Sequence, residues 1–518
     1  MRISIDIGTH MARAACLDVN GRPQLIHLAH GAEGMPALAR QTMRGLEVGV
    51  EAALALAGNA ETTVCGCTRL MGRAGALPRE LLERLPYSVR EVSGEAICDL
   101  LHAEVRAADV YGQIARALVD EVERVLGEQV DAVVLTVPAS AEDRFRIQAR
   151  AAVEAQGIPV LRLINRPAAA LLALAEREPL ATATARHVAV VDCGGGTTDV
   201  SIARCDADSA RVLATAGDAL LGGDDLIWEV ARQLNMRFQN IAGVDVFAVD
   251  ESHLAAQGLR SAAAEALGTL RLAPEALLAL DHGGGFGRDL MTLVRRSDVD
   301  AWLAPWFERI AGLCQRALAS AKLRSKQIDA VLLIGDAAGL PGIHELVVRA
   351  FGRAPIALPA AQATEMPVLG AASAISSGPS SIWDVTPYPL GINCYYGEEE
   401  LFSPIVAANT TIPSPPVGAQ GAFVERYTTR YPDQTRVKLD VLQYRGPRIP
   451  ATSGAGRVYP HECEVLGSWD FAGLQPRKGQ HAAFSVTFTL DADGILHLHA
   501  EETATGHTLN ASVDRGIG

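Results

Sequence analysis

Two segments of this chain share a pattern of residue types that suits a phosphorylated ligand. Residues 2–9 read RISIDIGT and residues 187–199 read HVAVVDCGGGTTD. Each is an apolar run that ends in Asp, continues with Gly and Thr, and is followed by a second strand-like run. Glycine lets backbone N–H groups approach phosphate oxygens, threonine hydroxyls add donors, and a strand-end carboxylate can hold a hydrated metal ion. We therefore expect two strand–turn–strand loops that grip one nucleotide, unlike the strand–loop–helix of a Walker loop.

Two further glycine-rich stretches lie outside these loops. Residues 217–225, GDALLGGDD, open a predicted helix with acidic residues in its first turn. The triplet at 283–285 also resembles a phosphate loop, but it lies between two predicted hairpin strands and lacks the Asp-x-Gly ending. A flexible hairpin tip is the interpretation that we favour for this triplet.

Bulk composition limits the classes of function. The 518 residues are 49% hydrophobic and 20% charged, which indicates a globular chain of more than one domain. The net charge is −14 and no Lys/Arg run reaches four residues, so we expect no nucleic-acid partner and no anionic membrane partner. The nine cysteines are scattered, the chain begins directly in a strand containing Asp6, and the longest apolar stretch is 167–175. These features predict a cytoplasmic protein.

The elements that must position the loops follow from periodicity. Up to about residue 376, strands and helices alternate, with helices expected at 111–127, 142–155, 252–267, 298–324 and 341–351 and strands at 131–138, 160–165, 276–280, 290–294 and 329–334. Residues 378–384 have a linker composition. From Val385 onward, short alternating runs at 437–444, 482–490 and 495–501 predict a β-sandwich, with a type I′-like turn at 491–496.

This order of pieces resembles the DnaK family, the seventy-kilodalton heat-shock chaperones. The segments that carry the resemblance are IDIGT, LTVPASAEDRFRIQARAAVEAQG, RLINRPAAALLALA, VVDCGGGTTDVSIA, LATAGDALLGGDD, WDVTPYPLGI, ANTTIP and LDADGILHLHA. The resemblance implies an α/β actin-like two-lobed ATPase domain at 1–377, a linker at 378–384 and an all-β sandwich domain at 385–518 that binds peptides. In the family a helical lid follows the sandwich, whereas this sequence ends at Gly518, so we expect a lidless protein.

The resemblance also assigns roles in a site for ATP and Mg²⁺. Asp6 and Asp192 would hold the metal shell, and Thr197 and Asp199 would help to organise the γ-phosphate and the attacking water. The remaining matches would bind the nucleotide: Gly8, Thr9, Gly194, Gly195, Gly196, Gly222 and Gly223.

Other matched positions concern partners. Pro138 and Arg146 match the pair that relays nucleotide state to the peptide domain, and Arg162 and Asp384 match positions that dock a J-domain co-chaperone. The family implies a nucleotide exchange factor as a further partner. We expect extended or unfolded peptide segments as clients.

Several positions depart from the family where its chemistry is done. Thr68 stands where a catalytic Lys is expected, Arg166 replaces an acidic residue beside the metal shell, and His10 replaces a second threonine of the first loop. Losing one pre-placed charge of this kind costs on the order of 10²–10³ in rate. Either Arg166 has taken over the role of the missing Lys, or the site turns over little and the fold is a scaffold.

The adenosine pocket departs as well. Residues 335–341 read GDAAGLP, so the family's adenine-stacking Arg is Gly339, and Asp336 brings a carboxylate, whereas Gly335 is kept. The clamp helix keeps Glu265, but other residues stand where Lys and Ser are expected: Gly268 and Leu272. Losing a stacked cation alone costs roughly 1 kcal/mol.

In the sandwich, the resemblance predicts an apolar peptide cleft under a small arch. Ile392, Val437 and Leu439 would line the cleft, and Tyr395 and Arg430 would form the arch. The alternative is that they are core residues of an ordinary sandwich. Without a lid, bound peptide should dissociate quickly.

Two functions remain open at this point. The first is an ATP-regulated chaperone with slow hydrolysis that binds extended apolar segments. The second is a pseudo-ATPase scaffold whose sandwich docks one dedicated partner. A sugar or acetate kinase of the same ATPase superfamily is disfavoured, because such enzymes would not need the β-sandwich.

Overall fold

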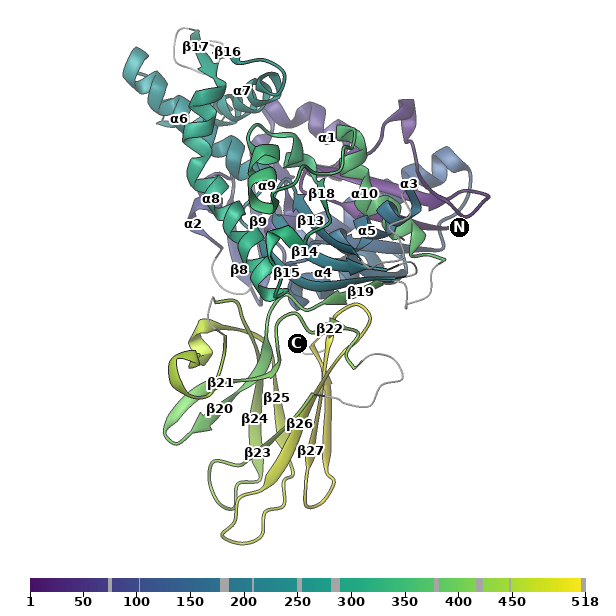
Figure 1. Ribbon diagram of the computed structural model, residues 1–518, viewed down its shortest axis with the longest axis vertical. Helices are drawn as coiled ribbons and strands as arrows, with labels where there is room; N and C mark the ends of the chain where they lie inside the picture. Colours follow the sequence, from purple (N-terminus) through teal and green to yellow (C-terminus); the bar gives the residue numbers. More distant parts are fainter. Residues whose placement is uncertain are drawn as a thin grey trace.

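The chain forms an α/β part with an all-β part beneath it (Figure 1). The computed structural model describes residues 1–72, 77–101, 103–177, 186–206, 209–248, 254–280, 289–376, 382–415, 423–446 and 449–513. The glycine triplet at 283–285 lies outside these residues. No helix in the described ranges is long and apolar enough to cross a membrane.

The first large sheet carries the first predicted phosphate loop. Its strand order is β12-β11-β1-β2-β3, with β4 also on β2, and its members are β1 (Arg2–Ile7), β2 (Met11–Leu17), β3 (Pro23–Leu25), β4 (Met35–Pro36), β11 (Ala132–Val137) and β12 (Val160–Asn165). β1 and β2 are an antiparallel hairpin, and β1 pairs with β11 in parallel. Alternate apolar residues of β1 and β11 face α3 (Ala107–Leu126) and α4 (Asp143–Glu154).

The second large sheet repeats this plan around the second loop. Its order is β18-β13-β14-β15-β19-β22, and its members are β13 (Arg186–Cys193), β14 (Thr198–Cys205), β15 (Ala210–Asp218), β18 (Ala330–Ile334), β19 (Ile382–Val385) and β22 (Thr411–Ile412). One face packs on a core with α6 (Gly223–Ala242), α7 (Leu254–Leu270), α8 (Arg296–Ser320) and α9 (Ile343–Phe351).

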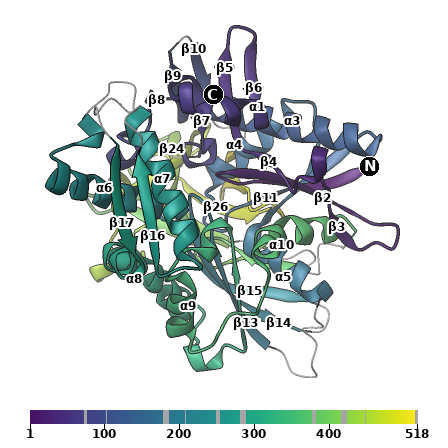
Figure 2. The ribbon, with the colours of Figure 1, turned by 90° about the horizontal axis from the view of Figure 1, so that it is seen from above.

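Two helices lie between the sheets and join the two lobes. Figure 2 shows α5 (Arg166–Arg177) and α10 (Ala360–Ser373) near the centre of the molecule, above β13–β15 in this view. Their small side chains, such as Ala169 and Ala372, share one core with Val134 of the first sheet and Val190 of the second. A Cβ on Gly370 would lie 1.7 Å from the carbonyl oxygen of Ala169, so the two helices cross in close contact. Neither helix was among the predicted elements.

Smaller elements extend from each lobe. The first lobe adds two small sheets, made of β5 (Leu38–Thr42), β6 (Gly45–Val48) and β7 (Thr63–Cys65) and of β8 (Ser88–Val92), β9 (Glu95–Leu100) and β10 (Ala103–Arg106), with the short helices α1 (Val50–Ala55) and α2 (Arg79–Leu82). The second lobe adds the predicted hairpin of β16 (Glu275–Leu280) and β17 (Leu290–Arg295). The five helices predicted by range and the helix predicted to open at 217–225 are all present, with ends shifted by a few residues.

The all-β part is a sandwich of two four-stranded antiparallel sheets. One contains β20 (Leu390–Tyr396), β21 (Glu399–Val406), β24 (Arg436–Tyr444) and β25 (Cys463–Ala472), and the other β23 (Phe423–Thr428), β26 (Ala483–Leu490), β27 (Leu496–Glu502) and β28 (Thr508–Ser512). Buried aromatic residues fill the space between the sheets: Phe471, Phe484 and Phe488.

The turn between β26 and β27 differs from the predicted type I′. A type I′ turn needs positive φ at both central residues, but within 491–495 positive φ occurs at Gly494 alone (77°). The amide of Asp491 donates to the carbonyl of Ile495 across three intervening residues, and the Asp491 side chain accepts from the amides of Asp493 and Ile495. The turn prediction was wrong because this carboxylate holds a three-residue turn.

The segment predicted as a linker becomes part of a sheet. Residues 378–381 lie outside the described ranges, but β19 pairs in parallel with β15 and antiparallel with β22. One sheet therefore runs from the second lobe through the connecting segment to the sandwich. Composition alone did not predict this strand, because its pairing partners come from distant parts of the chain.

Candidate nucleotide and peptide sites

Both predicted phosphate loops are tight turns between antiparallel strands, as expected. The amide of Gly8 donates to the carbonyl of Met11 at 2.8 Å, and that of Gly194 donates to Thr197 at 2.9 Å. A Cβ on Gly8 would come within 3.0 Å of the Met11 oxygen. The turns are thus built so that little more than backbone fits in them.

The two loops face each other across the interface between the lobes. A Cβ on Gly195 would lie 2.6 Å from Nδ1 of His10, and a Cβ on Gly196 would lie 2.7 Å from Oγ1 of Thr9. The loops are therefore in direct contact, and the glycines permit it. This arrangement agrees with the expectation that both loops would hold one ligand.

A third turn rests on the second loop. The amide of Gly223 donates to the carbonyl of Gly194 at 2.9 Å, and that of Asp224 donates to Gly195 at 2.8 Å. A Cβ on Gly222 would lie 2.4 Å from the carbonyl carbon of Gly196. The turn is therefore part of the same loop assembly, and it starts α6.

Three carboxylates gather at the ends of the loop strands. Asp192 is buried, and its Oδ2 has no hydrogen-bond partner among the described residues. Burial raises the pKa of Asp192 to about 7; the charge of Arg166 opposes this shift, and the charges of Asp199 and Asp6 add to it. Burial also raises the pKa of Asp199, to about 6, although its oxygens accept hydrogen bonds from the amides of Ser140 (3.1 Å) and Ala139 (3.2 Å). Buried carboxylates of this kind are stabilised by a cation.

Arg166 supplies positive charge at this point. Its Nε donates to Oδ1 of Asp6 at 2.8 Å, and its Nη2 donates to the carbonyl of Ile7 at 3.0 Å. Burial disfavours the charged guanidinium, but Asp6 and Asp192 outweigh it and raise the pKa of Arg166. Thr68 is close by, with its Oγ1 3.5 Å from Oγ1 of Thr9. The charge that the family carries at position 68 is absent there, and a guanidinium lies at the first loop instead.

These residues fit the phosphates of a nucleotide and a hydrated Mg²⁺ ion in part. The glycine turns expose backbone, and the unpartnered Asp192 oxygen beside Asp6 and Asp199 suits a metal-bound water. Arg166 already neutralises Asp6. A metal ion would therefore share Asp6 with this guanidinium.

The interface between the lobes beside the loops is crossed by ion pairs that the sequence did not reveal. Nε2 of His10 lies 3.0 Å from Asp224, Nη2 of Arg13 lies 3.7 Å from Asp336, and Arg69 donates to both oxygens of Asp225 at 2.8 and 2.9 Å. In each pair the cation comes from the first lobe and the acid from the second. The lobes are therefore held together next to the loops by charge.

The predicted base pocket is altered as the sequence indicated. Gly335 has φ of 95°, and a Cβ there would lie 2.6 Å from Oδ1 of Asp192, so glycine is required. Glu265 lies exposed on α7. A Cβ on Gly339 would lie 2.6 Å from Nη2 of Arg271 at the end of α7. A guanidinium thus lies against the position that lost one, and no sequence signal distinguished Arg271 from other surface arginines.

The predicted peptide residues line one groove of the sandwich. A cavity of about 790 Å³ is bounded by β20, β24 and the segment after β23, and all five predicted residues line it: Ile392, Tyr395, Arg430, Val437 and Leu439. Leu439 and Ile392 are buried, and Val437 is half-buried. The floor is therefore apolar.

A cation–π contact crosses the top of this groove. The guanidinium carbon of Arg430 lies 3.8 Å from the ring centroid of Tyr395, and Nη2 of Arg430 donates to Glu398 at 3.1 Å. The two predicted arch residues therefore do meet. Tyr395 is 43% exposed, whereas Ile392 and Leu439 belong to the buried core of the sandwich. The assignment of a peptide cleft therefore stays a prediction.

Three of the four predicted coupling residues lie where the α/β part meets the sandwich. Arg146, Arg162 and Asp384 line one small cavity with Asp493 of the β26–β27 turn. Arg146 is buried and donates to Oδ1 of Asn165 at 2.5 Å and to the carbonyl of Asp493 at 3.1 Å. The amide of Leu163 donates to Oδ1 of Asp493 at 2.6 Å. The wrongly predicted turn is therefore itself a contact between the two parts.

Pro138 connects this interface to the nucleotide loops. It precedes Ala139 and Ser140, whose amides bind Asp199, and its carbonyl accepts from the amide of Ala141 just before α4. Arg146 lies on α4. Nε of Arg146 donates to the carbonyl of Ala141 at 3.2 Å, so hydrogen bonds and the backbone of residues 139–141 together connect Asp199 to the sandwich.

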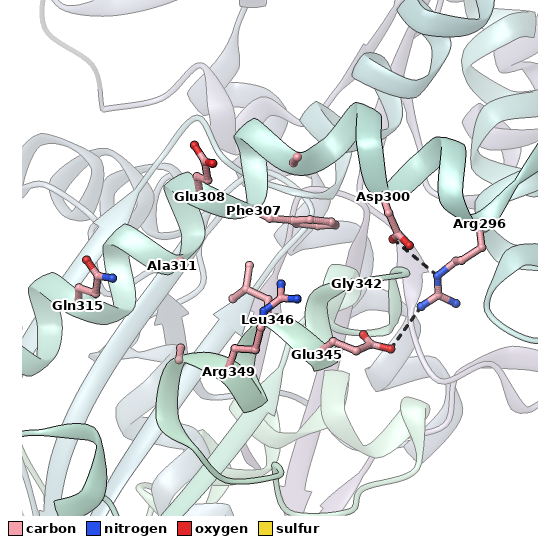
Figure 3. Close-up of a pocket in the computed structure, with 12 residues that line it drawn as sticks. Arg296, Asp300, Phe307, Glu308, Ala311, Gln315, Gly342, Glu345, Leu346 and Arg349 are labelled. Carbon is pink, nitrogen blue, oxygen red and sulfur yellow. Dashed lines mark hydrogen bonds and ion pairs between the residues drawn. The ribbon is translucent and has the colours of Figure 1, made fainter.

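A separate groove of about 680 Å³ lies between α8 and α9 (Figure 3). Phe307 projects between the two helices, and Arg296 lies 3.9 Å from Asp300 and 3.4 Å from Glu345 at one end. No residue predicted for the nucleotide, peptide or coupling sites lines it. This groove does not contribute to either candidate site.

Comparison with known proteins gives the family. The model described as Hsp70 protein matches residues 2–516. The chain belongs to the Hsp70 family. It is 28% identical over 526 residues to the "Chaperone protein HscA homolog" of Shewanella sp. (strain ANA-3) and 30% identical over 535 residues to that of Shewanella amazonensis (strain ATCC BAA-1098 / SB2B). Both alignments cover 100% of this chain and 79% of the relative.

The resemblance to the DnaK family is thereby confirmed. The Hsp70 family consists of ATP-binding chaperones, and this chain is one of its members. The match covers both the loop assembly and the sandwich. The departures at Thr68, Arg166 and Gly339 therefore occur within a chain that matches the Hsp70 family over residues 2–516.

Proposed function

We propose that this Hsp70-family protein binds extended apolar peptide segments in the Tyr395–Arg430 groove and regulates their release with ATP and Mg²⁺. Residues 1–377 would form the nucleotide-binding domain and residues 385–518 the peptide-binding domain. The observation that carries the proposal is the path from Asp199 through the amides of Ala139 and Ser140 to Arg146 and Asp493. The path reaches the sandwich at Asp493, and this connection supports coupling between the carboxylate site and the peptide-binding part.

Within this proposal, hydrolysis is slow. Asp6, Asp192 and Asp199 would hold the hydrated metal ion, which would offset the charge of the phosphates and orient water. Arg166, at the start of α5 and beside the first loop, would place its guanidinium near the γ-phosphate. Thr68 cannot supply a charge, so the guanidinium of Arg166 would replace the family's Lys from a position less well placed to contact the γ-phosphate.

Peptide binding would follow strand-like recognition. An extended segment in the groove would bury apolar side chains against Ile392, Val437 and Leu439. Tyr395 and Arg430 would close over the segment. Exchange of peptide would require this cation–π contact to open.

The interface residues would also receive partners. Arg162 and Asp384 face each other where the sandwich meets the first lobe. A J-domain co-chaperone would dock there, because these positions match those of the family. A nucleotide exchange factor would act by separating the lobes.

Calorimetry with Mg-ATP and no peptide tests the nucleotide part. Binding at micromolar strength, followed by faster release of a fluorescent apolar peptide when ATP is added, is expected. Asp199→Asn should keep peptide binding but lose the effect of ATP, since it removes one charge at the start of the path. Absence of binding at millimolar ATP would contradict the proposal and favour a pseudo-ATPase scaffold with a dedicated partner.

A further inference from the structure

The turn of the first phosphate loop contains a histidine that reaches across to the second lobe. Nε2 of His10 lies 3.0 Å from Asp224 at the start of α6, and Nδ1 lies 3.9 Å from Asp336, in the short turn after β18. A Cβ on Gly195 would lie 2.6 Å from Nδ1, so the ring also rests against the second loop. One imidazole of the first lobe therefore stands between two carboxylates of the second.

The walls of the two lobes leave space between them beside this ring. A cavity of about 230 Å³ lies there, and His10 and Asp224 are among its lining residues. The large buried cores of the two lobes are separate, and the core that they share lies around α5 and α10. Separation of the walls beside the loops would therefore break charged contacts and leave the shared core buried.

The other charged contacts across the lobes do not respond to pH near neutrality. Arg69 donates to Asp225 at 2.8 Å, and Nη2 of Arg13 lies 3.7 Å from Asp336. A guanidinium keeps its charge at all these pH values, whereas an imidazole has an ordinary pKa of about 6.5. Among the ion pairs that cross the lobes beside the loops in the described chain, His10 is thus the cation that can lose its charge near neutral pH.

The groups that face His10 favour its charged form. Burial disfavours the charge on the ring and would lower its pKa, and the charge of Arg260 on α7 acts in the same direction. Asp224, through its charge and a hydrogen bond, and Asp336, through its charge, outweigh these effects and raise the pKa of His10. The closed arrangement therefore holds a proton on this ring more tightly than water would.

Asp224 and the groups beyond it keep one charge state near neutral pH. Burial would raise the pKa of Asp224, but the charges of His10 and Arg260 outweigh it and lower that pKa, so the carboxylate stays ionised. Burial raises the pKa of the nearby Cys65 thiol to about 11, so the thiol stays neutral. The remaining charged neighbours are guanidinium groups: Arg13, Arg69 and Arg260.

We propose that His10 makes the contact between the two lobes sensitive to pH, with a closed form that is favoured when the ring is protonated. A protonated ring donates from both nitrogens toward Asp224 and Asp336, whereas a neutral ring turns one acceptor nitrogen toward a carboxylate. Closure is therefore strongest below the ordinary pKa of histidine and weakens as the pH rises through the raised pKa of the closed form. Phosphate oxygens between the loops would compete for the same ring, and this consequence alone rests on the proposed nucleotide site.

The test uses the full chain without nucleotide, so that failure of ATP binding cannot affect it. Fluorophores replace Met43 in the first lobe and Leu272 in the second, because each of these side chains is 96% exposed. Energy transfer between them is followed from about pH 5.5 to 8.5, a range that brackets histidine. We expect the ratio of closed to open molecules to fall about two- to fivefold as the pH rises, the effect of one partly exposed ion pair.

Three variants locate the effect. His10→Gln is neutral at every pH and should remove the dependence, whereas His10→Lys keeps a charge and should hold the lobes closed throughout. His344→Gln is the matched control, because His344 is exposed on α9 of the second lobe, and its dependence should equal that of the wild type. Nuclear magnetic resonance of the imidazole protons should show a lower pKa of His10 in Asp224→Asn.

Three results would each overturn the proposal. The first is energy transfer in the wild-type chain that does not change with pH. The second is a dependence that persists unchanged in His10→Gln. The third is closure that strengthens as the pH rises.

Discussion

Nε of Arg166 donates to Oδ1 of Asp6 at 2.8 Å, so a guanidinium lies at the strand end that opens the first phosphate loop. The family has an acidic residue at position 166 and a lysine at position 68. Here the positive charge stands at position 166 instead of position 68: Thr68 is neutral, and its hydroxyl lies 3.5 Å from that of Thr9. Positive charge at the loop is therefore kept, but it comes from α5.

Arg166→Glu should lower ATP turnover by a factor on the order of 10²–10³, because it removes the pre-placed cation and adds a negative charge beside Asp6 and Asp192. Single-turnover hydrolysis at saturating Mg-ATP measures this. Arg177→Gln is the control: it lies on the same helix, is exposed, and donates to Gln362 far from the loops. Turnover that is unchanged or faster in Arg166→Glu would show that Arg166 has not taken over the lysine's role.

Adding Thr68→Lys to Arg166→Glu should recover at least tenfold of the lost turnover. The double variant restores the family's distribution of charge on the two walls. The two substitutions should be strongly non-additive, because both act on one charge site. A double variant as slow as Arg166→Glu alone would mean that other departures, such as Asp336, limit the rate. Single-turnover rates of all four proteins complete the cycle.

Val437→Phe should abolish binding of a fluorescent apolar peptide. The half-buried Val437 side chain lies in the floor of the groove, and the larger ring would occupy the space of a peptide side chain. Val424→Phe is the matched control on β23, where Val424 is 49% exposed and does not line the groove. Fluorescence anisotropy provides the measurement. Normal peptide affinity in Val437→Phe would rule out this groove.

Tyr395→Ala and Arg430→Ala should each speed peptide dissociation about two- to fivefold, because an exposed cation–π contact contributes about 0.5–1 kcal/mol. The contact needs both partners, so the double variant should be little faster than either single variant. Stopped-flow competition gives the rates. Fully multiplicative effects would mean that the two side chains contact the peptide independently and form no arch.

Docking of the sandwich onto α4 should weaken as the pH rises from about 4 to 7. Burial raises the pKa of Asp143 to about 7, with Arg146 opposing and Glu464 and Asp491 adding to the shift. An exposed Asp has a pKa of about 3.9, so Asp143 holds its proton more tightly when the sandwich is docked. Between about pH 3.9 and 7 the undocked form is ionised and the docked form is protonated, so rising pH disfavours docking. Above about pH 7 both forms are ionised and docking changes no further.

Asp143→Asn should make docking of the sandwich less dependent on pH, because it removes one of the titrating groups. Burial also raises the pKa values of Asp384 and Asp493, and these shifts act in the same direction, so some dependence remains. Energy transfer between fluorophores on the two parts of the chain measures docking. Asp109→Asn is the control, because Asp109 pairs with Arg106 on the surface. Docking that strengthens as the pH rises would contradict the assignment.

The loop assembly could be predicted from sequence because it depends on backbone. Asp, Gly and Thr at the ends of apolar strands allow few geometries, and both turns formed as expected at Gly8 and Gly194. Alternation along β24 also indicated that Val437 and Leu439 share one face of a strand, whereas the groove itself was expected from the resemblance to the family. Sequence patterns that repeat along one element, or that a particular turn requires, can therefore be interpreted from the sequence alone.

Pairs between distant elements could not be predicted. Arg69 and Asp225 are 156 positions apart, and the proximity of Arg271 to Gly339 depends on how α7 packs. The strand β19 needs β15 as a neighbour, which its own residues do not indicate. Such features follow from tertiary packing, so a single sequence leaves them undetermined.

The strand β19 also protects a surface. While it pairs with β15, the backbone of Ala210 and Arg211 is covered, and Arg211 donates to Oγ1 of Thr411 at 3.2 Å. If the sandwich departs, this stretch becomes the open rim of a sheet, to which another polypeptide could add a strand. The charged side chain of Arg211, no longer bonded to Thr411, would then disfavour the addition of such a strand. Undocking of the sandwich would thus expose a sheet edge that favours self-association, with Arg211 at that edge.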